Sequence, residues 1–255
     1  MLLAVSEGGH SSNLALTALC LIGFVFIHLY SGKLLFLEQI PRSRWLSAAS
    51  GASVAYVFVH VLPDLSKHQE AITNTGMIGF LEYHVYLMAL VGLAVFYGLE
   101  RMVMESQSQK PDPETGTTAG LGVFWVHMLA FSLYNALIGY LLVQGEEKSP
   151  RSLLMFFIAL GLHFVINDFG LRTDHRSTYH RVGRWILAGA IALGWMVGAG
   201  TEISEAAIAV LFAFVAGAII LNVLKEELPE ERQSRFWAFA LGAAAYSVLL
   251  LALAL

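Results

Sequence analysis

The chain has 255 residues, of which 57% are hydrophobic and only 13% are charged, and its mean hydropathy is +0.66. A soluble domain carries about 25% charged residues, so this composition excludes one and indicates a polytopic membrane protein. The net charge of −4, without a basic stripe, also excludes a nucleic-acid partner.

A helix needs about 20 mainly apolar residues to cross a bilayer core roughly 30 Å thick. Eight runs of the sequence satisfy this, and none alternates in the way that a strand of a transmembrane barrel does. We therefore predict an all-α fold class, with a single membrane domain over residues 1–255. The predicted spans are 13–32, 46–62, 80–99, 120–143, 153–171, 185–200, 206–224 and 236–255.

The loops that follow the odd-numbered spans contain nearly all lysines and arginines, and only Lys67, Lys148 and Arg151 fall on the other side. Because cytoplasmic loops carry the excess of these residues, we expect both termini outside the cytoplasm, in a bacterial inner membrane. The polar segment 103–118 is predicted to be a flexible cytoplasmic loop. The first run is too long for a signal-peptide core, so it is expected to be a retained span.

A histidine and an aspartate close the second span. His60 and Asp64 are four residues apart and so share one helix face, and Pro63 is predicted to end or kink the helix near the outer surface. The pair is either the entrance of a metal path or a satisfied helix terminus, and the spacing leaves both interpretations open.

The fifth span carries the deepest polar residues, His163, Asn167 and Asp168. A polar group in hydrocarbon is costly unless it finds a partner, so these residues are candidates for a functional site. On the fourth span, Asn135 lies at a similar depth if the two spans pair through their short turn. Imidazole, carboxylate and amide oxygen suit zinc, manganese or iron. Alternatively, these side chains form hydrogen bonds across a helix pair and fix its packing.

The remaining histidines have less specific interpretations. His28 and His127 stand alone in their spans, and we expect them to be packing residues. His175 and His180 lie in an arginine-rich loop, where we expect a solvated surface or contact with lipid headgroups.

Two segments echo one another. Residues 51–64, GASVAYVFVHVLPD, resemble residues 215–230, VAGAIILNVLKEELPE, on a span of opposite direction. Such an inverted repeat is typical of secondary transporters. Gly194 and Gly198, together with small residues of the last span, form GxxxG-like faces that allow a homodimer.

Together these features resemble the ZIP (Zrt/Irt-like) family of divalent metal transporters. The resemblance rests on the eight spans, the long loop before the fourth, and the segment 60–64, HVLPD, which is similar to the family's His-Leu-Leu-Pro-Glu. It implies a bundle in which spans 1–3 and 6–8 form an inverted repeat around spans 4 and 5.

The family's fourth-span motif is His-Asn-x-x-Glu/Asp-Gly, and residues 134–139 correspond to it. Asn135 and Gly139 match, whereas Tyr134 and Ile138 replace the histidine and the acidic ligand.

The fifth-span motif is similar to His-Glu-x-Pro-His/Glu-Glu/Gly. His163 matches it, Asn167 and Asp168 stand for the last two ligands, and Phe164 and Ile166 depart from it.

The resemblance implies a carrier of divalent cations that works by alternating access, has no enzymatic activity and holds no tightly bound cofactor. Zn²⁺ is the first expectation for the substrate, with Mn²⁺ or Fe²⁺ as alternatives. Because the motifs are degenerate, two alternatives remain: a ZIP-fold protein that has lost metal transport and acts as a regulatory or assembly partner, or a carrier of a non-metal solute. The predicted metal ligands are His163, Asp168, Asn167, Asn135, His60 and Asp64.

Overall fold

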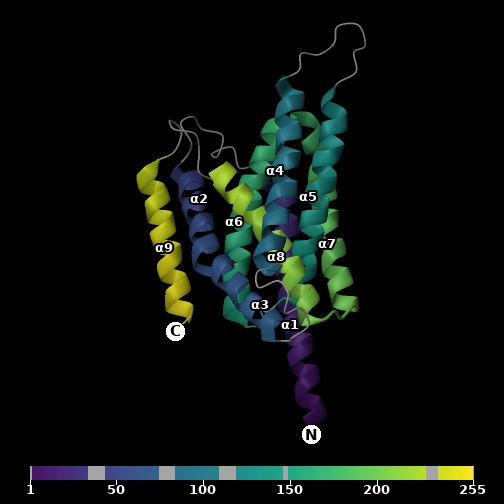
Figure 1. Cartoon of the computed structure of the whole chain (residues 1–255), viewed down its shortest axis with the longest axis vertical. Coiled ribbons are helices and arrows are strands. Elements are labelled where there is room, and N and C mark those ends of the chain that lie inside the picture. The colour runs from purple at the N-terminus through teal and green to yellow at the C-terminus, as the bar shows by residue number, and fades with distance from the viewer. Residues whose placement is uncertain are drawn as a thin grey trace.

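The computed structural model describes residues 2–33, 44–74, 84–108, 119–145, 149–227 and 235–254. Within these ranges all regular structure is helical, and the helices form one elongated bundle (Figure 1). The α-helices are α1 (Leu2–Tyr30), α2 (Arg44–Tyr56), α3 (Leu62–Asn74), α4 (His84–Ser108), α5 (Ala119–Gln144), α6 (Pro150–Thr178), α7 (Arg184–Gly200), α8 (Glu205–Asn222) and α9 (Phe236–Ala254). The shorter turns are the 3-10 turn η1 (Ser31–Lys33) and the π turns η3 (Val57–Val61), η4 (Tyr179–Gly183) and η5 (Val223–Glu227).

Among the described residues, seven helical segments are long and apolar enough to cross a membrane, so the chain is a polytopic helical membrane protein. The eighth predicted span corresponds to α9, whose apolar part, Phe236–Ala252, is too short to meet the same criterion. The seven segments are Asn13–Lys33, Ser47–Glu70, His84–Met102, Phe124–Gln144, Pro150–Arg172, Tyr179–Gly200 and Glu205–Lys225.

The predicted end of the second span at residue 62 is wrong. The helix passes through the π turn Val57–Val61 and continues as α3 to Asn74. Pro63 has no N–H to donate, and its ring crowds the carbonyl four residues earlier; a π turn just before it lets the helix continue. His60 and Asp64 consequently lie within a helix that extends to Glu70 rather than at its end.

Two predicted loops are also partly helical. In the predicted loop 103–118, residues 103–108 belong to α4, and 109–118 lie outside the described residues. After the fifth span, α6 continues to Thr178 and joins α7 through η4. Residues such as Met, Glu, Gln and Arg favour helix, so helices extend beyond the apolar runs into the polar surroundings.

Helices α2 and α9 approach each other through glycine. A Cβ atom added to Gly51 would collide with the carbonyl oxygen of Phe239, and one added to Gly242 would collide with that of Ala48. Both positions therefore require glycine for this close contact.

Helices α4 and α8 approach each other in the same way. A Cβ atom on Gly92 would collide with the carbonyl oxygen of Phe214, and one on Gly217 with that of Ala89. Figure 1 shows α2 beside α9, and α4 in front of α8.

One constant offset in residue number relates α2 to α8. It takes Gly51 to Gly217, and it takes Val57, the first residue of η3, to Val223, the first residue of η5. The two helices thus share a close-packed glycine and a π turn at matching positions.

The predicted dimer faces are occupied within the chain. A Cβ atom on Gly194 would collide with the carbonyl oxygen of Ala136, and one on Gly198 would lie 2.9 Å from that of Tyr140. These glycines of α7 pack against α5, as Gly242 of α9 packs against α2. The faces that contain Gly194, Gly198 and Gly242 therefore serve the fold of one chain, and the homodimer stays a prediction.

Candidate functional site

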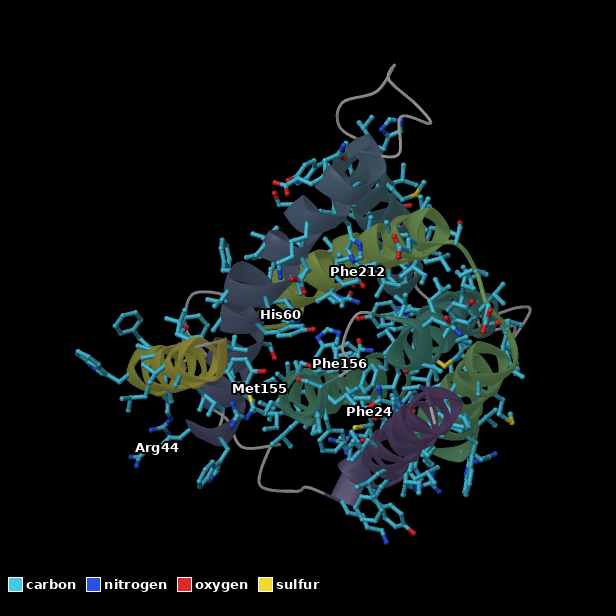
Figure 2. All side chains as sticks on the ribbon, turned by 90° about the horizontal axis from the view of Figure 1, so that it is seen from below. Phe24, Arg44, His60, Met155, Phe156 and Phe212 are labelled. Carbon is cyan, nitrogen blue, oxygen red and sulfur yellow. The ribbon has the colours of Figure 1, made fainter. Side chains whose placement is uncertain are left out.

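A pocket of about 590 Å³, including its open mouth, lies at the end of the bundle where α3 is found. Residues of α2, η3, α3, α5, α6 and α8 line it, and the lining is mainly aliphatic and aromatic. Figure 2, viewed from this end, shows His60, Phe156 and Phe212 around the same opening. The histidine and carboxylate side chains among the described lining residues are His60, Asp64 and His68.

His60 and Asp64 contact each other, as their spacing on one helix face predicted. Nε2 of His60 lies 3.2 Å from Oδ2 of Asp64, and the two side chains are 24% and 13% exposed. The ammonium of Lys67 lies 2.7 Å from Oδ1 of Asp64, but its side chain is 67% exposed. Since an exposed ion pair contributes only about 0–1 kcal/mol, an incoming cation can displace Lys67 at small cost.

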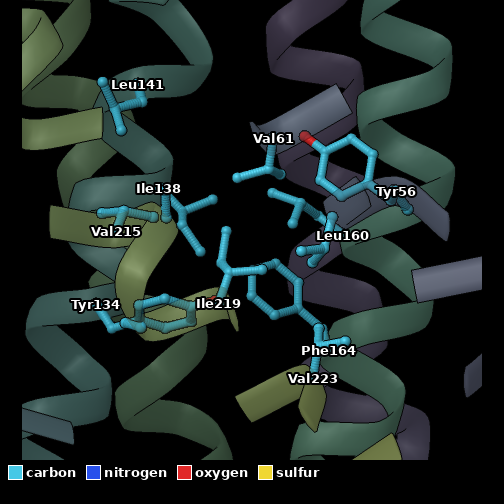
Figure 3. Close-up of a cluster of buried hydrophobic side chains, with 14 of the residues drawn as sticks. Tyr56, Val61, Tyr134, Ile138, Leu141, Leu160, Phe164, Val215, Ile219 and Val223 are labelled. Carbon is cyan, nitrogen blue, oxygen red and sulfur yellow. The ribbon is translucent and has the colours of Figure 1, made fainter. Parts of the chain in front are cut away.

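Apolar side chains close the inner end of this pocket. Ile138, Leu160 and Ile219 line the pocket. One helical turn deeper lie three further buried residues, Tyr134, Phe164 and Val223. We call these six residues the hydrophobic plug (Figure 3). An apolar constriction of this kind blocks water and ions by dewetting. The plug consists of Tyr134, Ile138, Leu160, Phe164, Ile219 and Val223.

Three residues of the plug occupy positions at which the ZIP motifs have metal ligands: Tyr134, Ile138 and Phe164. At these three positions side chains that do not ordinarily bind a metal ion therefore replace the family's ligands. Within the part of the chain that the structure describes, no three His, Cys, Asp or Glu side chains are placed to hold one metal ion.

Beside the plug lies a buried polar network centred on His28. Its Nδ1 lies 3.0 Å from Oδ1 of Asp168, and its Nε2 lies 2.9 Å from Oδ1 of Asn135. Asp168 also accepts hydrogen bonds from the hydroxyl groups of Ser31, at 3.0 Å, and Tyr179, at 2.6 Å. These donors offset the cost of burying a carboxylate that is 1% exposed. The structure thus brings together two predicted ligands, Asp168 and Asn135, through a histidine that was predicted only to pack.

Asn135 presents its side-chain oxygen to His28. The Nδ2 amide of Asn135 donates to the carbonyl of Phe131 at 2.8 Å, which leaves its Oδ1 to accept from Nε2 of His28. Since Nδ1 faces the carboxylate of Asp168, both ring nitrogens of His28 face oxygen atoms. His28 therefore links α6 to α5 through its two ring nitrogens.

The other predicted ligands of the fifth span are placed elsewhere. Nε2 of His163 lies 3.0 Å from the hydroxyl of Tyr134, so it joins α6 to α5 rather than meeting Asp168 at His28. Asn167 is buried, and its Nδ2 has no hydrogen-bond partner among the described residues. The contacts of His163 and Asp168 are those of the alternative in which polar side chains fix helix packing.

Two further histidines form a pair that the sequence did not suggest. Nδ1 of His127 lies 2.9 Å from Nε2 of His175, joining α5 to the end of α6. Burial lowers the pKa of His175, and the carboxylate of Glu100 opposes that shift. His175 is only partly buried, and His180 is exposed, as expected for a residue of this loop.

Comparison of the sequence with models of known protein families finds no match, and comparison with characterised proteins finds none either. The chain is therefore described by its fold and by its site. It is a helical membrane protein with a pocket at one end, a hydrophobic plug beneath the pocket and a buried ionic network beside the plug.

Proposed function

We propose that the chain is a ZIP-like secondary carrier that moves a divalent metal ion across a bacterial inner membrane by alternating access. Zn²⁺ is the first candidate, with Mn²⁺ or Fe²⁺ as alternatives. The observation that carries the proposal is the match between α2 with η3 and α8 with η5, which share a close-packed glycine and a π turn at one offset. Inverted repeats that contain interrupted helices are typical of secondary transporters.

In this proposal, spans 1–3 and 6–8 are the two repeats, and α9 is the eighth span. The pairs α2 with α9 and α4 with α8 correspond to one another under the repeat, and both are locked by glycine contacts. Each pair can therefore move as a rigid unit. Relative rocking of the two pairs against α5 and α6 would open the plug at the inner side and close the pocket at the outer side.

Both interrupted helices line the pocket, which supports its role as the outward-facing substrate site. Tyr56, His60 and Val61 come from α2 and η3, and Val215 and Ile219 come from α8. The distance between the lining residues of the two repeats would thus change as the carrier moves between its outward-facing and inward-facing states.

The pair His60 and Asp64 supplies the chemistry for a cation. Its imidazole nitrogen and carboxylate oxygens are ligands that zinc, manganese and iron accept, and water would complete the coordination. Such incomplete ligation favours release as well as capture. The charge of Asp64 also draws cations to a pocket that is otherwise mainly apolar.

The experiment is uptake of isotope-labelled Zn²⁺, Mn²⁺ and Fe²⁺ into liposomes that contain the purified protein. We expect Asp64→Asn and His60→Ala to lower the initial rate by about tenfold or more, as the loss of a metal-supporting group does. Glu202→Gln removes an exposed carboxylate that does not line the pocket and should leave the rate unchanged. Uptake equal to that of empty liposomes, or unaffected by both pocket variants, would contradict the proposal.

A second candidate substrate is an organic cation with an apolar body. The mainly apolar lining of the pocket and the apolar residues at the ZIP ligand positions favour it. Uptake of a labelled hydrophobic amine would distinguish the two, because it should depend on the charge of Asp64 and not on His60. Loss of amine uptake in Asp64→Asn, with normal uptake in His60→Ala and no metal uptake, would select this candidate.

A further inference from the structure

A second, smaller pocket of about 260 Å³ lies at the opposite end of the bundle, where α1, the end of α6 and the start of α7 meet. Its lining is strongly cationic. Lys33 comes from η1, Arg172 from α6, His180 from η4 and Arg184 from α7. None of these side chains lines the larger pocket that contains His60 and Asp64, so the smaller pocket does not depend on the proposed transport function.

The negative charge nearest to this pocket is already satisfied from within the protein. The carboxylate of Asp168 accepts hydrogen bonds from Ser31 and Tyr179 and pairs with His28, and these three donors themselves line the pocket. Among the described residues that line the pocket, Lys33, Arg172 and Arg184 carry positive charge and none is acidic.

The arginines are arranged for an anionic oxygen. Nη1 of Arg184 donates to the carbonyl of Leu29 at 3.2 Å, while its buried Nε has no partner among the described residues. A Cβ atom on Gly32 would lie 3.1 Å from Nη1 of Arg172 and 3.9 Å from Nδ1 of His180. The missing side chain at Gly32 therefore leaves room for the guanidinium of Arg172 and the imidazole of His180 to converge.

Exposed aromatic rings flank the pocket at the level of the membrane surface. Nζ of Lys33 lies 4.7 Å from the ring centre of Tyr30, and the guanidinium of Arg184 lies 5.5 Å from that of Trp185. Tyr30 and Trp185 are 42% and 57% exposed. Exposed tyrosine and tryptophan beside lysine and arginine mark the headgroup region of a bilayer.

We propose that this pocket binds the phosphate group of an anionic phospholipid from the adjacent leaflet. Paired guanidinium groups bind phosphate oxygens through charge-assisted hydrogen bonds, and basic pockets between spans at the lysine-rich and arginine-rich side bind lipid headgroups. The flanking rings select a lipid rather than a soluble phosphate, because they place the acyl chains against the outer surface of α1 and α7. Bound lipid would hold α1, α6 and α7 together at this end.

The test uses the full chain purified in a neutral detergent. Native mass spectrometry and thermal unfolding would be followed with added phosphatidylglycerol, phosphatidylcholine or inorganic phosphate. Phosphatidylglycerol should bind and raise the unfolding temperature, and the other two should not. Arg172→Gln should weaken phosphatidylglycerol binding about tenfold, as loss of one charge-assisted hydrogen bond predicts.

The matched control is Arg101→Gln, which removes an exposed arginine at the same end of the bundle that does not line the pocket. It should leave lipid binding unchanged. Gly32→Val provides a second variant that retains every charge but fills the pocket, and it should also weaken binding if Arg172→Gln fails to fold. Equal binding of both lipids, an equal effect of inorganic phosphate, or wild-type affinity in the folded pocket variants would overturn the proposal.

Discussion

Nδ1 of His28 lies 3.0 Å from Oδ1 of Asp168, across 140 positions of sequence. Both side chains are fully buried, and the contact ties α1 to α6, while the other ring nitrogen of His28 reaches Asn135 on α5. Removal of one partner would leave the other polar side chain buried without its hydrogen-bond partner, which is costly. The network therefore fixes how three helices meet beside the hydrophobic plug.

Substitution at Asp168 should lower stability far more than substitution at the mouth of the pocket lined by His60 and Asp64. We expect Asp168→Asn to reduce the free energy of unfolding by about 3–5 kcal/mol, and Tyr179→Phe, which removes one donor to the carboxylate, to reduce it by about 1.5–3 kcal/mol. Thermal unfolding in detergent measures both. Asp64→Asn is the control, since the carboxylate of Asp64 reaches solvent. If the Asp168→Asn protein is as stable as the Asp64→Asn protein, the network does not hold the helices together.

The glycine contacts make a second, paired prediction. Gly217→Ala should destabilise the fold, because its Cβ atom would collide with the backbone of α4 at Ala89. Gly189→Ala places the same methyl group where no atom lies within 4 Å, and in a helix it should be neutral or stabilise the protein by about 0.5–1 kcal/mol. The unfolding temperatures of the two variants give the test. Equal temperatures would show that α4 and α8 are not held by this contact.

Much of the fold could be predicted because apolar length is a direct consequence of bilayer thickness. Among the described residues, seven of the eight predicted spans fall on helical segments long and apolar enough to cross a membrane. The predicted ends differ from those of the helices, since helix-favouring polar residues extend α4 and α6 and a π turn carries the second helix past Pro63. The echo between residues 51–64 and 215–230 pairs Gly51 with Gly217, each of which packs closely against a neighbouring helix, and the inverted repeat itself stays a prediction.

The site was less predictable, and the reason is geometric. Spacing reveals which residues share a helix face, so the contact between His60 and Asp64 could be predicted. It cannot reveal which helices meet, so the partners of Asp168, in particular His28 and Tyr179, were missed. The sequence showed that Tyr134, Ile138 and Phe164 depart from the ZIP motifs. It could not show that these residues meet in one hydrophobic plug, because that depends on how the helices pack.

The hydrophobic plug predicts an effect on leakage. Ile138→Ala should widen the constriction and allow protons or small ions to cross the protein, because a wider apolar passage wets more readily. Flux of protons into liposomes that contain a pH-sensitive dye measures this leak. Leu133→Ala, on the same helix but 56% exposed, should leave the liposomes as tight as the wild-type protein does.

The proton leak of the Ile138→Ala and Leu133→Ala proteins can be separated from effects of these substitutions on folding. Ile138→Ala should lower stability by about 2–5 kcal/mol, so the leak is compared at a temperature at which both variants remain folded. A folded Ile138→Ala protein without any leak would mean that the barrier to permeation lies elsewhere in the bundle.

The pair of His127 and His175 predicts how stability responds to acid. Because burial lowers the pKa of His175, the folded protein binds fewer protons at this residue than the unfolded chain does. This contribution to stability is complete above about pH 6.5, the ordinary value for histidine, and is lost as the pH falls below it. Nδ1 of His127, 2.9 Å away, adds to the effect since two imidazolium ions cannot share that contact. The ion pair of Glu100 with Lys225 lies on neighbouring elements, and the carboxylate of Glu100 partly opposes the shift.

The measurement is the unfolding temperature between pH 7.5 and pH 5 for the wild-type protein and for His175→Gln. Glutamine retains hydrogen-bonding groups but does not titrate, so the decrease in unfolding temperature towards acid pH should be smaller in this variant. His180→Gln is the control, because that side chain is exposed and should leave the pH dependence unchanged. If all three proteins lose stability equally on acidification, the protonation of His175 does not contribute to the acid sensitivity.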